Sequence, residues 1–136
     1  MTFESNRRRS LELDLAAEPE SPARARHALR EALAGVAVDI DAVELAVSEA
    51  VANATVHAYR DERAPDAGPG RVRVSARIDG DELSVVVSDD GVGMAPRADS
   101  PGLGLGLPLI AQLSDGLEIQ QRPTGSRMVI RFRIAA

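Results

Sequence analysis

The chain has 136 residues, of which 44% are apolar and 27% charged, and its 16 basic and 21 acidic side chains give a net charge of −5. This length fits one domain, which we expect to span residues 1–136 with residues 1–9 as a flexible N-terminal segment. The absence of cysteine excludes disulfides, thiolate zinc sites and cysteine nucleophiles. Because every basic residue is an arginine, the chain also lacks the lysine that a Walker-type phosphate loop or a Schiff base needs.

The acidic balance and the scarcity of aromatic residues (Phe3, Tyr59 and Phe132) argue against direct binding of nucleic acid, which requires a basic face and stacking rings. No apolar run approaches the roughly 18 residues of a membrane span. The arginines at 7–9 precede alternating leucine and acid rather than the apolar segment of an export signal. We therefore expect a cytoplasmic protein that does not contact the membrane.

The first half of the chain predicts one strand and two helices. Residues 11–15 alternate leucine with acid, which is typical of a strand with one face in water. Ser21 as the N-cap and Pro22 at the first helical position predict a helix that ends near Ala34. A second helix is predicted over residues 39–59, beginning at an aspartate cap, with small and apolar residues at three- and four-residue spacing on its buried face.

The second half predicts a hairpin, a helix and two more strands. Residues 72–78 and 83–87 alternate, and the Asp79-Gly80 pair between them favours a tight hairpin turn. Residues 91–106 are expected to form a glycine-rich loop, followed by a short apolar helix at about 107–113. The order predicts an α+β two-layer sandwich: a mixed, mostly antiparallel sheet with about three helices on one face.

The second helix carries two polar residues among small and apolar neighbours. Glu49 and Asn53 are four residues apart and therefore share one face. A carboxylate in such surroundings costs several kcal/mol, by order of magnitude, unless a metal ion, a water or a partner hydroxyl compensates it. The alternative, which the sequence leaves open, is that both side chains face solvent.

An acid and two spaced glycines, Asp89, Gly91 and Gly93, follow an apolar strand. Asp89 could accept a hydrogen bond worth about 1.5–3 kcal/mol from an exocyclic amine, while the glycines let a flat ring lie against the backbone. The alternative is an ordinary tight turn, in which Asp and Gly are common. Asp90 is the neighbouring candidate, but the spacing to the glycines favours Asp89.

A glycine run, Gly102 to Gly106, leads into the third helix, with Pro108 placed in its first turn. Free backbone N–H groups at a helix start, approached closely past glycines, can bind an anion. Without lysine, a phosphate would have to meet backbone dipoles, arginine and magnesium. The run lacks the G-x-G-x-x-G spacing of a dinucleotide-binding loop, and a simple hinge is the alternative.

The order of these three motifs (E-x-x-x-N, D-x-G-x-G and G-L-G-L) resembles the GHKL, or Bergerat-fold, ATP-binding superfamily. Within it, the chain resembles the short anti-sigma-factor serine kinases of the RsbW/SpoIIAB type. The resemblance implies that Asp89 holds the adenine amino group above a floor formed by Gly91 and Gly93. It also implies that Asn53 ligates Mg²⁺ and that residues 94–103 form a short ATP lid. The phosphates would be wrapped by Gly102, Gly104, Leu105 and Gly106, and Ser126 would replace the family's usual threonine near the adenine.

The same resemblance implies ATP or ADP with Mg²⁺ as cofactors and Glu49 as the general base that deprotonates a partner serine. The implied partners are a sigma factor, which is sequestered, and a STAS-domain antagonist, which is phosphorylated; a homodimer is also possible. Arg26 and Arg30, on one face of the first helix, could dock an acidic partner, or could form an ordinary solvated face.

Two other functions share parts of this pattern. A regulatory binding module whose partner affinity depends on nucleotide would need the same pocket and no phosphoryl transfer. The catalytic domain of a histidine kinase is disfavoured, because we expect no phospho-acceptor helix before residue 10. Such a domain would also need a lid longer than residues 94–103.

Overall fold

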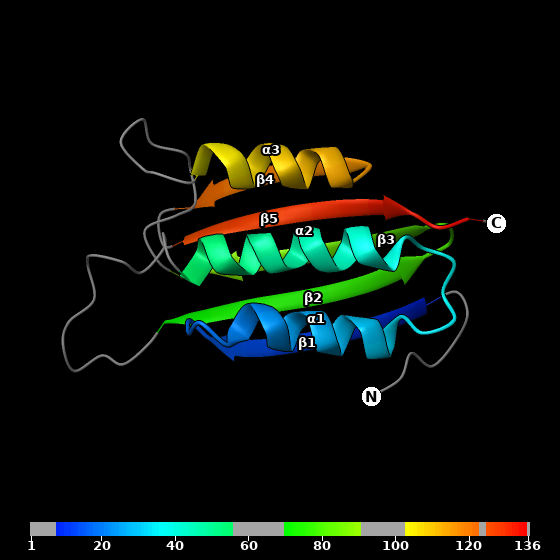
Figure 1. Ribbon diagram of the computed structural model, residues 1–136, viewed down its shortest axis with the longest axis horizontal. Coiled ribbons are helices and arrows are strands. Elements are labelled where there is room, and N and C mark those ends of the chain that lie inside the picture. The colour runs from blue at the N-terminus through cyan, green and yellow to red at the C-terminus, as the bar shows by residue number, and fades with distance from the viewer. Residues whose placement is uncertain (1–7, 56–69, 91–102, 123–124, 136) are drawn as a thin grey trace.

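The structure is a computed structural model that describes residues 8–55, 70–90, 103–122 and 125–135. Figure 1 shows one sheet with the helices together on one of its faces, which confirms the α+β two-layer sandwich. The elements are β1 (Arg8–Ala16), α1 (Ser21–Ala32), α2 (Ile40–Asn53), β2 (Arg71–Asp79), β3 (Glu82–Asp89), α3 (Leu103–Leu113), β4 (Gly116–Arg122) and β5 (Gly125–Arg133).

The sheet has five strands in the order β1-β2-β3-β5-β4, and every neighbouring pair is antiparallel. The described strands therefore contain no parallel pair, which a mixed sheet would need. The reason is the connections: β2 turns directly back into β3 and β4 into β5, and β5 then pairs in the opposite direction with β3. Because β5 lies between β3 and β4, the ends of β3 and β5 become neighbours.

The hairpin between β2 and β3 confirms the expected turn. Asp79 pairs with Glu82, which leaves Gly80 and Asp81 as a two-residue loop. Gly80 has a φ of 66°, whereas no described residue other than glycine has a positive φ. A positive φ at only the first loop residue is the type II′ pattern, in which glycine is favoured.

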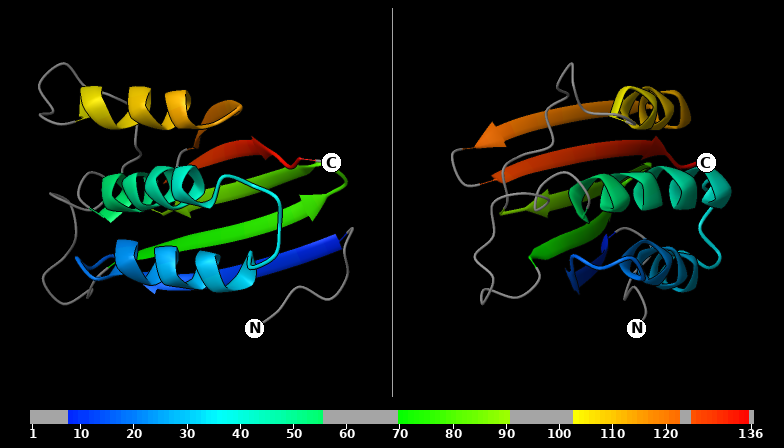
Figure 2. Two further views of the ribbon diagram at one scale, coloured as in Figure 1. Left: turned by 45° about the vertical axis from the view of Figure 1, so that its right-hand side comes forward. Right: turned by 60° about the vertical axis from the view of Figure 1, so that its left-hand side comes forward.

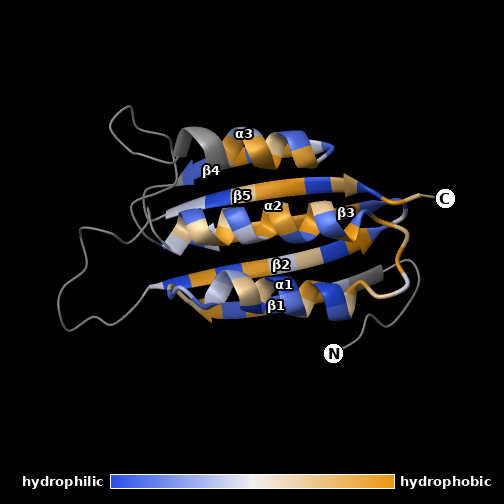
Figure 3. Cartoon of the chain, in the orientation of Figure 1, coloured by the Kyte–Doolittle hydropathy of each residue, from blue (hydrophilic) through white to orange (hydrophobic). Residues whose placement is uncertain are grey.

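The core lies between the sheet and the helix layer. Burial alternates along β2 and β3, and Figure 3 shows hydrophobic and hydrophilic residues alternating along the strands. Each helix contributes fully buried side chains, such as Leu29 on α1, Val47 on α2 and Ile110 on α3. The predicted buried face of the second helix is thus confirmed, and Asp39 caps it by accepting a hydrogen bond from the backbone N–H of Ala42 at 3.2 Å.

Two predictions near the N-terminus are wrong. β1 begins at Arg8, so Arg8 and Arg9 pair with β2 rather than belonging to a flexible segment. Ser21 is the first residue of α1 and not its N-cap, which is Glu20. The Ser21 hydroxyl is buried and donates to the carbonyl of Ala16, so it joins α1 to the end of β1 instead of capping the helix.

The third helix is longer than predicted. It begins at Leu103, so Pro108 lies inside it rather than in its first turn. Glycine in a helix costs only about 1 kcal/mol, a penalty that packing against the core can offset, and Ile110 of α3 is fully buried. The backbone N–H that Pro108 lacks would have bonded to the carbonyl of Gly104.

Helix α2 ends at Asn53 and is followed by two residues in a wider helical turn; the predicted continuation to Tyr59 lies outside the described residues. None of the helices in the described ranges combines the length and apolar character that crossing a membrane requires.

Candidate functional site

Four element ends meet at one end of the molecule. Figures 1 and 2 show that α2 and β3 finish there, and that α3 and β5 begin there. The sequence-predicted residues Asn53, Asp89 and Ser126 are terminal or nearly terminal in these elements. The fold therefore brings together polar residues that the sequence spreads over more than half of the chain.

Asp89 is a buried carboxylate with a direct partner. Its side chain is 2% exposed, and its Oδ2 accepts a hydrogen bond of 2.9 Å from the hydroxyl of Ser126, which is fully buried. The two residues are directly opposite each other across β3 and β5. Asp90, by contrast, is exposed. Because a carboxylate offers about four acceptor positions, one hydroxyl does not exhaust what this group can bind.

Gly125 allows the close approach of β5 to Asp89. Its φ is 135°, and a Cβ on this residue would lie 1.9 Å from the carbonyl oxygen of Asp89. The structure shows that the absence of a side chain at this position lets Ser126 reach the Asp89 carboxylate.

We expect Gly125→Ala to destabilise the fold by about 2 kcal/mol, because alanine must shift the Asp89 backbone and adopt a φ that side chains disfavour. Urea unfolding measures the loss. Gly116→Ala is the matched control, since a Cβ there would be 3.7 Å from its nearest neighbour, an ordinary contact. Equal stability of the two variants would contradict the role assigned to Gly125.

Asn53 and Glu49 lie one turn apart on α2, about 6 Å along the helix axis. Asn53 is 6% exposed, and no described residue accepts a hydrogen bond from its Nδ2. Glu49 is half-buried. The alternative in which both residues simply face solvent is thus wrong for Asn53. Since buried polar groups are nearly always hydrogen-bonded, this amide is poised for a partner that the described residues do not supply.

The remaining predicted residues concern the phosphate and adenine loops. Gly91, Gly93 and Gly102 lie outside the described residues, as do all but the last residue of the 94–103 segment. Gly104, Leu105 and Gly106 form the first turn of α3 rather than a loop. The first turn of a helix leaves backbone N–H groups without intrahelical acceptors, so the donors expected for an anion are still present.

Magnesium fits this site only as a companion of a bound phosphate. In the described part of the chain, no three His, Cys, Asp or Glu residues gather into a cation site. Mg²⁺ is typically held by one or two protein oxygens together with substrate phosphates and water. The Asn53 amide can offer such an oxygen, because its oxygen and nitrogen exchange places when the amide turns over.

The Arg30 side chain makes contacts within the fold. It forms ion pairs with Asp41, at 3.1 Å, and with Glu44, and so links α1 to α2. The hydrogen bond and the charge of Glu44 raise the pKa of Arg30 above its usual value, and Asp41 adds a smaller effect. The interpretation of Arg30 as a residue held out to an acidic partner is therefore not favoured by the structure.

Comparison with known proteins defines the class. Residues 15–134 match the histidine kinase-like ATPase domain, and the chain belongs to this family. It is 30% identical over 140 residues to the anti-sigma F factor of Clostridium beijerinckii, covering 93% of this chain and 94% of the relative. It is 33% identical over 132 residues to the serine-protein kinase RsbW of Bacillus velezensis, covering 81% of this chain and 77% of the relative.

Solved structures agree. The RsbU and RsbW domains of a Mycobacterium tuberculosis protein superpose with a TM-score of 0.71 at 27% identity, covering 92% of this chain and 32% of that one. A blue-light activated histidine kinase domain from Erythrobacter litoralis gives a TM-score of 0.57 at 26% identity, with coverage of 82% and 58%. The chain is thus a GHKL protein of the anti-sigma, RsbW type, which confirms the resemblance stated from the sequence.

Proposed function

We propose that the protein binds ATP and acts as a protein serine/threonine kinase that phosphorylates a STAS-domain antagonist and sequesters a sigma factor, in the cytoplasm. The observation that carries the proposal is the buried Asp89–Ser126 pair at the same end of the fold as Asn53 and Glu49. The names of two relatives, an anti-sigma F factor and a serine-protein kinase, support the same function.

In this proposal the adenine amino group donates to Asp89, and Ser126 holds the carboxylate in place from the other side. Gly91 and Gly93 form the floor beneath the ring. The first turn of α3, with Gly102 before it, donates backbone N–H groups to the phosphates. The Asn53 amide oxygen would hold Mg²⁺, which would supply positive charge to the phosphates.

Glu49 acts as the general base. Its carboxylate accepts the proton of the partner serine hydroxyl as the serine oxygen bonds to the γ-phosphorus, and the bond from that phosphorus to the bridging oxygen of ADP breaks. Phosphoryl transfer demands mainly positioning and electrostatic stabilisation from the protein, so one well-placed carboxylate is sufficient as the base. The half-buried Glu49 side chain remains accessible to a hydroxyl that arrives from outside.

Replacing Asn53 tests whether its amide is a ligand of Mg²⁺. We expect Mg²⁺ to strengthen ATP binding to the wild-type chain and to do so roughly tenfold less in Asn53→Ala, which corresponds to about 1.4 kcal/mol. Calorimetric titration with ATP in magnesium and in EDTA gives both values. If both proteins respond equally to magnesium, Asn53 is not a ligand of the metal.

Labelled ATP separates the kinase from the alternative of a nucleotide-dependent binding module. The chain is incubated with γ-labelled ATP and a candidate STAS-domain protein, and serine phosphorylation is followed with time. Label on a partner serine is the expected result. Binding of the partner that depends on nucleotide, without any transfer of label, would replace the kinase proposal by the binding module.

A further inference from the structure

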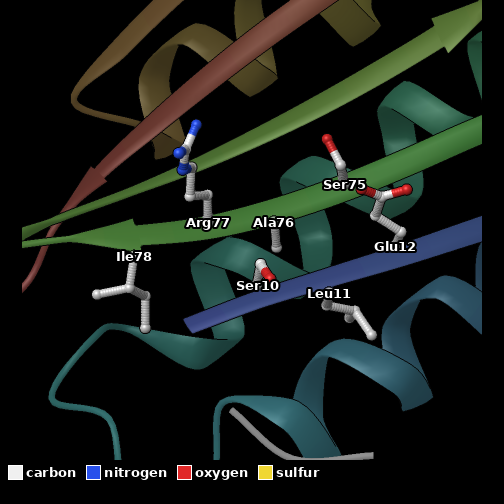
Figure 4. Close-up of a pocket in the computed structure, with 7 residues that line it drawn as sticks. All are labelled: Ser10, Leu11, Glu12, Ser75, Ala76, Arg77 and Ile78. Atoms are coloured by element: carbon white, nitrogen blue, oxygen red, sulfur yellow. The ribbon is translucent and has the colours of Figure 1, made fainter. Parts of the chain in front are cut away.

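The face of the sheet opposite the helices, here called the open face, is uncovered among the described residues (Figures 1 and 2). Strand alternation puts most polar residues of the strands on it, whereas Asp89 and Ser126 are in phase with the buried, core-facing positions. Figure 4 shows part of it at β1 and β2, with Ser75 and Arg77 on the side of the strands away from Leu11 and Ile78, which belong to the core. The described surface has three shallow hollows on this face, between rows of side chains.

Register arranges four arginines at the corners of a rectangle, here called the arginine rectangle: Arg73, Arg77, Arg127 and Arg131. Ser88 of β3 pairs with Arg73 on one side and Arg127 on the other, and Ser84 pairs in the same way with Arg77 and Arg131. Strand spacing makes the rectangle roughly 10 Å wide, and four residues along a strand make it roughly 13 Å long.

The centre of the arginine rectangle is small and apolar. The row between the two arginine rows consists of Ser75, Val86 and Val129, which pair with one another in that order across β2, β3 and β5. Val129 is 8% exposed and Val86 is half-buried, so neither protrudes beyond the arginines. The face therefore offers an apolar floor between two positively charged rows.

The arginine rectangle keeps most of its positive charge, and acidic residues border it. Arg73, Arg77 and Arg127 form no ion pair with another described residue, whereas Arg131 pairs with Glu118 of β4 at 3.1 Å. Hydrogen bonds from Gln120 and Arg131 lower the pKa of Glu118, which keeps that margin negative. Other acids edge two of the remaining sides, namely Glu12 and Asp14 on β1, and Asp79 and Glu82 at the hairpin. The last side carries Arg71, which pairs with Asp14.

We propose that the arginine rectangle docks an amphipathic acidic helix of a partner protein, with acids at positions i and i+8 and an apolar residue at i+4. Eight residues of α-helix rise about 12 Å, which matches the spacing of the two arginine rows. The acids then reach one row each, and the apolar residue meets Val86 and Val129. Guanidinium groups bind carboxylates through paired hydrogen bonds, so four arginines suit two acids.

The acidic margins favour such a compact epitope over a nucleic acid. A polyanion that crosses the strands would pass over Glu118 on one side or Glu12 on the other, where like charges repel it. One that follows the strands toward the hairpin would meet Asp79 and Glu82. The rectangle also lacks aromatic side chains on which bases could stack. A second copy of the chain packed face to face on this surface would place its arginine rectangle against this one, so that like charges repel.

The test uses a synthetic helical peptide with Glu, Leu and Glu at i, i+4 and i+8 in an otherwise uncharged sequence, titrated into the chain without nucleotide. We expect saturable binding that weakens as salt rises, and a loss of roughly tenfold for each of Arg73→Glu and Arg127→Glu. The matched control is Arg133→Glu, a change of equal charge on β5 and outside the rectangle, which should bind as wild type does. Circular dichroism verifies that the variants are folded.

Several results would overturn the proposal: no binding at low salt, equal binding of a peptide with Lys in place of Glu, or equal weakening by Arg133→Glu. Tighter binding of duplex DNA than of the peptide would do the same. Helix α2 itself carries the pattern at Asp41, Leu45 and Glu49, so sedimentation of the chain alone is also measured. Self-association abolished by Arg127→Glu would assign the face to a second copy instead. Because no nucleotide is present, failure here leaves the kinase proposal untouched.

Discussion

Glu49→Gln is expected to lower the rate of phosphoryl transfer to a STAS-domain substrate by roughly a hundred- to ten-thousand-fold, the usual contribution of a general base. Glutamine has the same shape and can still accept a hydrogen bond from the serine hydroxyl, but it cannot take the proton. ATP affinity should stay within about threefold of wild type, because Glu49 is assigned no contact with the nucleotide. Single-turnover transfer of labelled phosphate measures the rate, and calorimetry measures the affinity.

Glu31→Gln is the matched control for this experiment. Glu31 lies on α1, is exposed, and makes the same change in net charge when it is replaced. The control should transfer phosphate at the wild-type rate. A Glu49→Gln variant that transfers as fast as Glu31→Gln would remove Glu49 from the reaction, whatever the state of nucleotide binding.

Local patterns in the sequence predicted the parts of the site that lie within one element. The four-residue spacing of Glu49 and Asn53 is enough to place both on one face of α2, because helix geometry fixes that relation. The hairpin at Gly80 is likewise a local matter of turn chemistry. The pattern could not decide whether that face is exposed to solvent, because the burial of Asn53 depends on elements far away in the chain.

The pairing of Asp89 with Ser126 could not be derived from spacing. The two residues are 37 positions apart, and their contact requires that β5, not β4, lies beside β3. The need for glycine at position 125 could not be derived for the same reason, since only the approach of β5 to the Asp89 backbone reveals it. A strand that starts with Gly-Ser opposite a strand that ends in Asp was the available signal, and it required the strand order.

The start of α3 and the open face were missed for different reasons. Glycine is a weak helix former, so the run before Leu107 predicted a loop, whereas the helix extends back to Leu103. The arginines of β5 alternate with apolar residues in the sequence. Ser84 and Ser88 of β3 lie between these arginines and those of β2. This arrangement depends on the register of β2, β3 and β5, which cannot be read from one strand alone.

Asp89→Asn is expected to weaken ATP binding by about 1.5–3 kcal/mol, or roughly 10- to 150-fold. The buried carboxylate of Asp89 accepts from Ser126 and, in the proposed function, from the adenine amino group. An asparagine is uncharged and has a single acceptor oxygen, so the charge-assisted hydrogen bond from the amino group is lost. Calorimetry in magnesium measures the loss, and Asp90→Asn, an equal charge change at the exposed neighbour, should bind as wild type does.

A nucleotide without the amino group makes the test specific. Purine riboside triphosphate should bind the wild-type chain about as weakly as Asp89→Asn binds ATP, because either change removes the same hydrogen bond. The variant should then lose little more with this nucleotide, since interacting changes are not additive. Additive losses would mean that the amino group and Asp89 do not meet, and that the adenine lies away from the junction of β3 and β5.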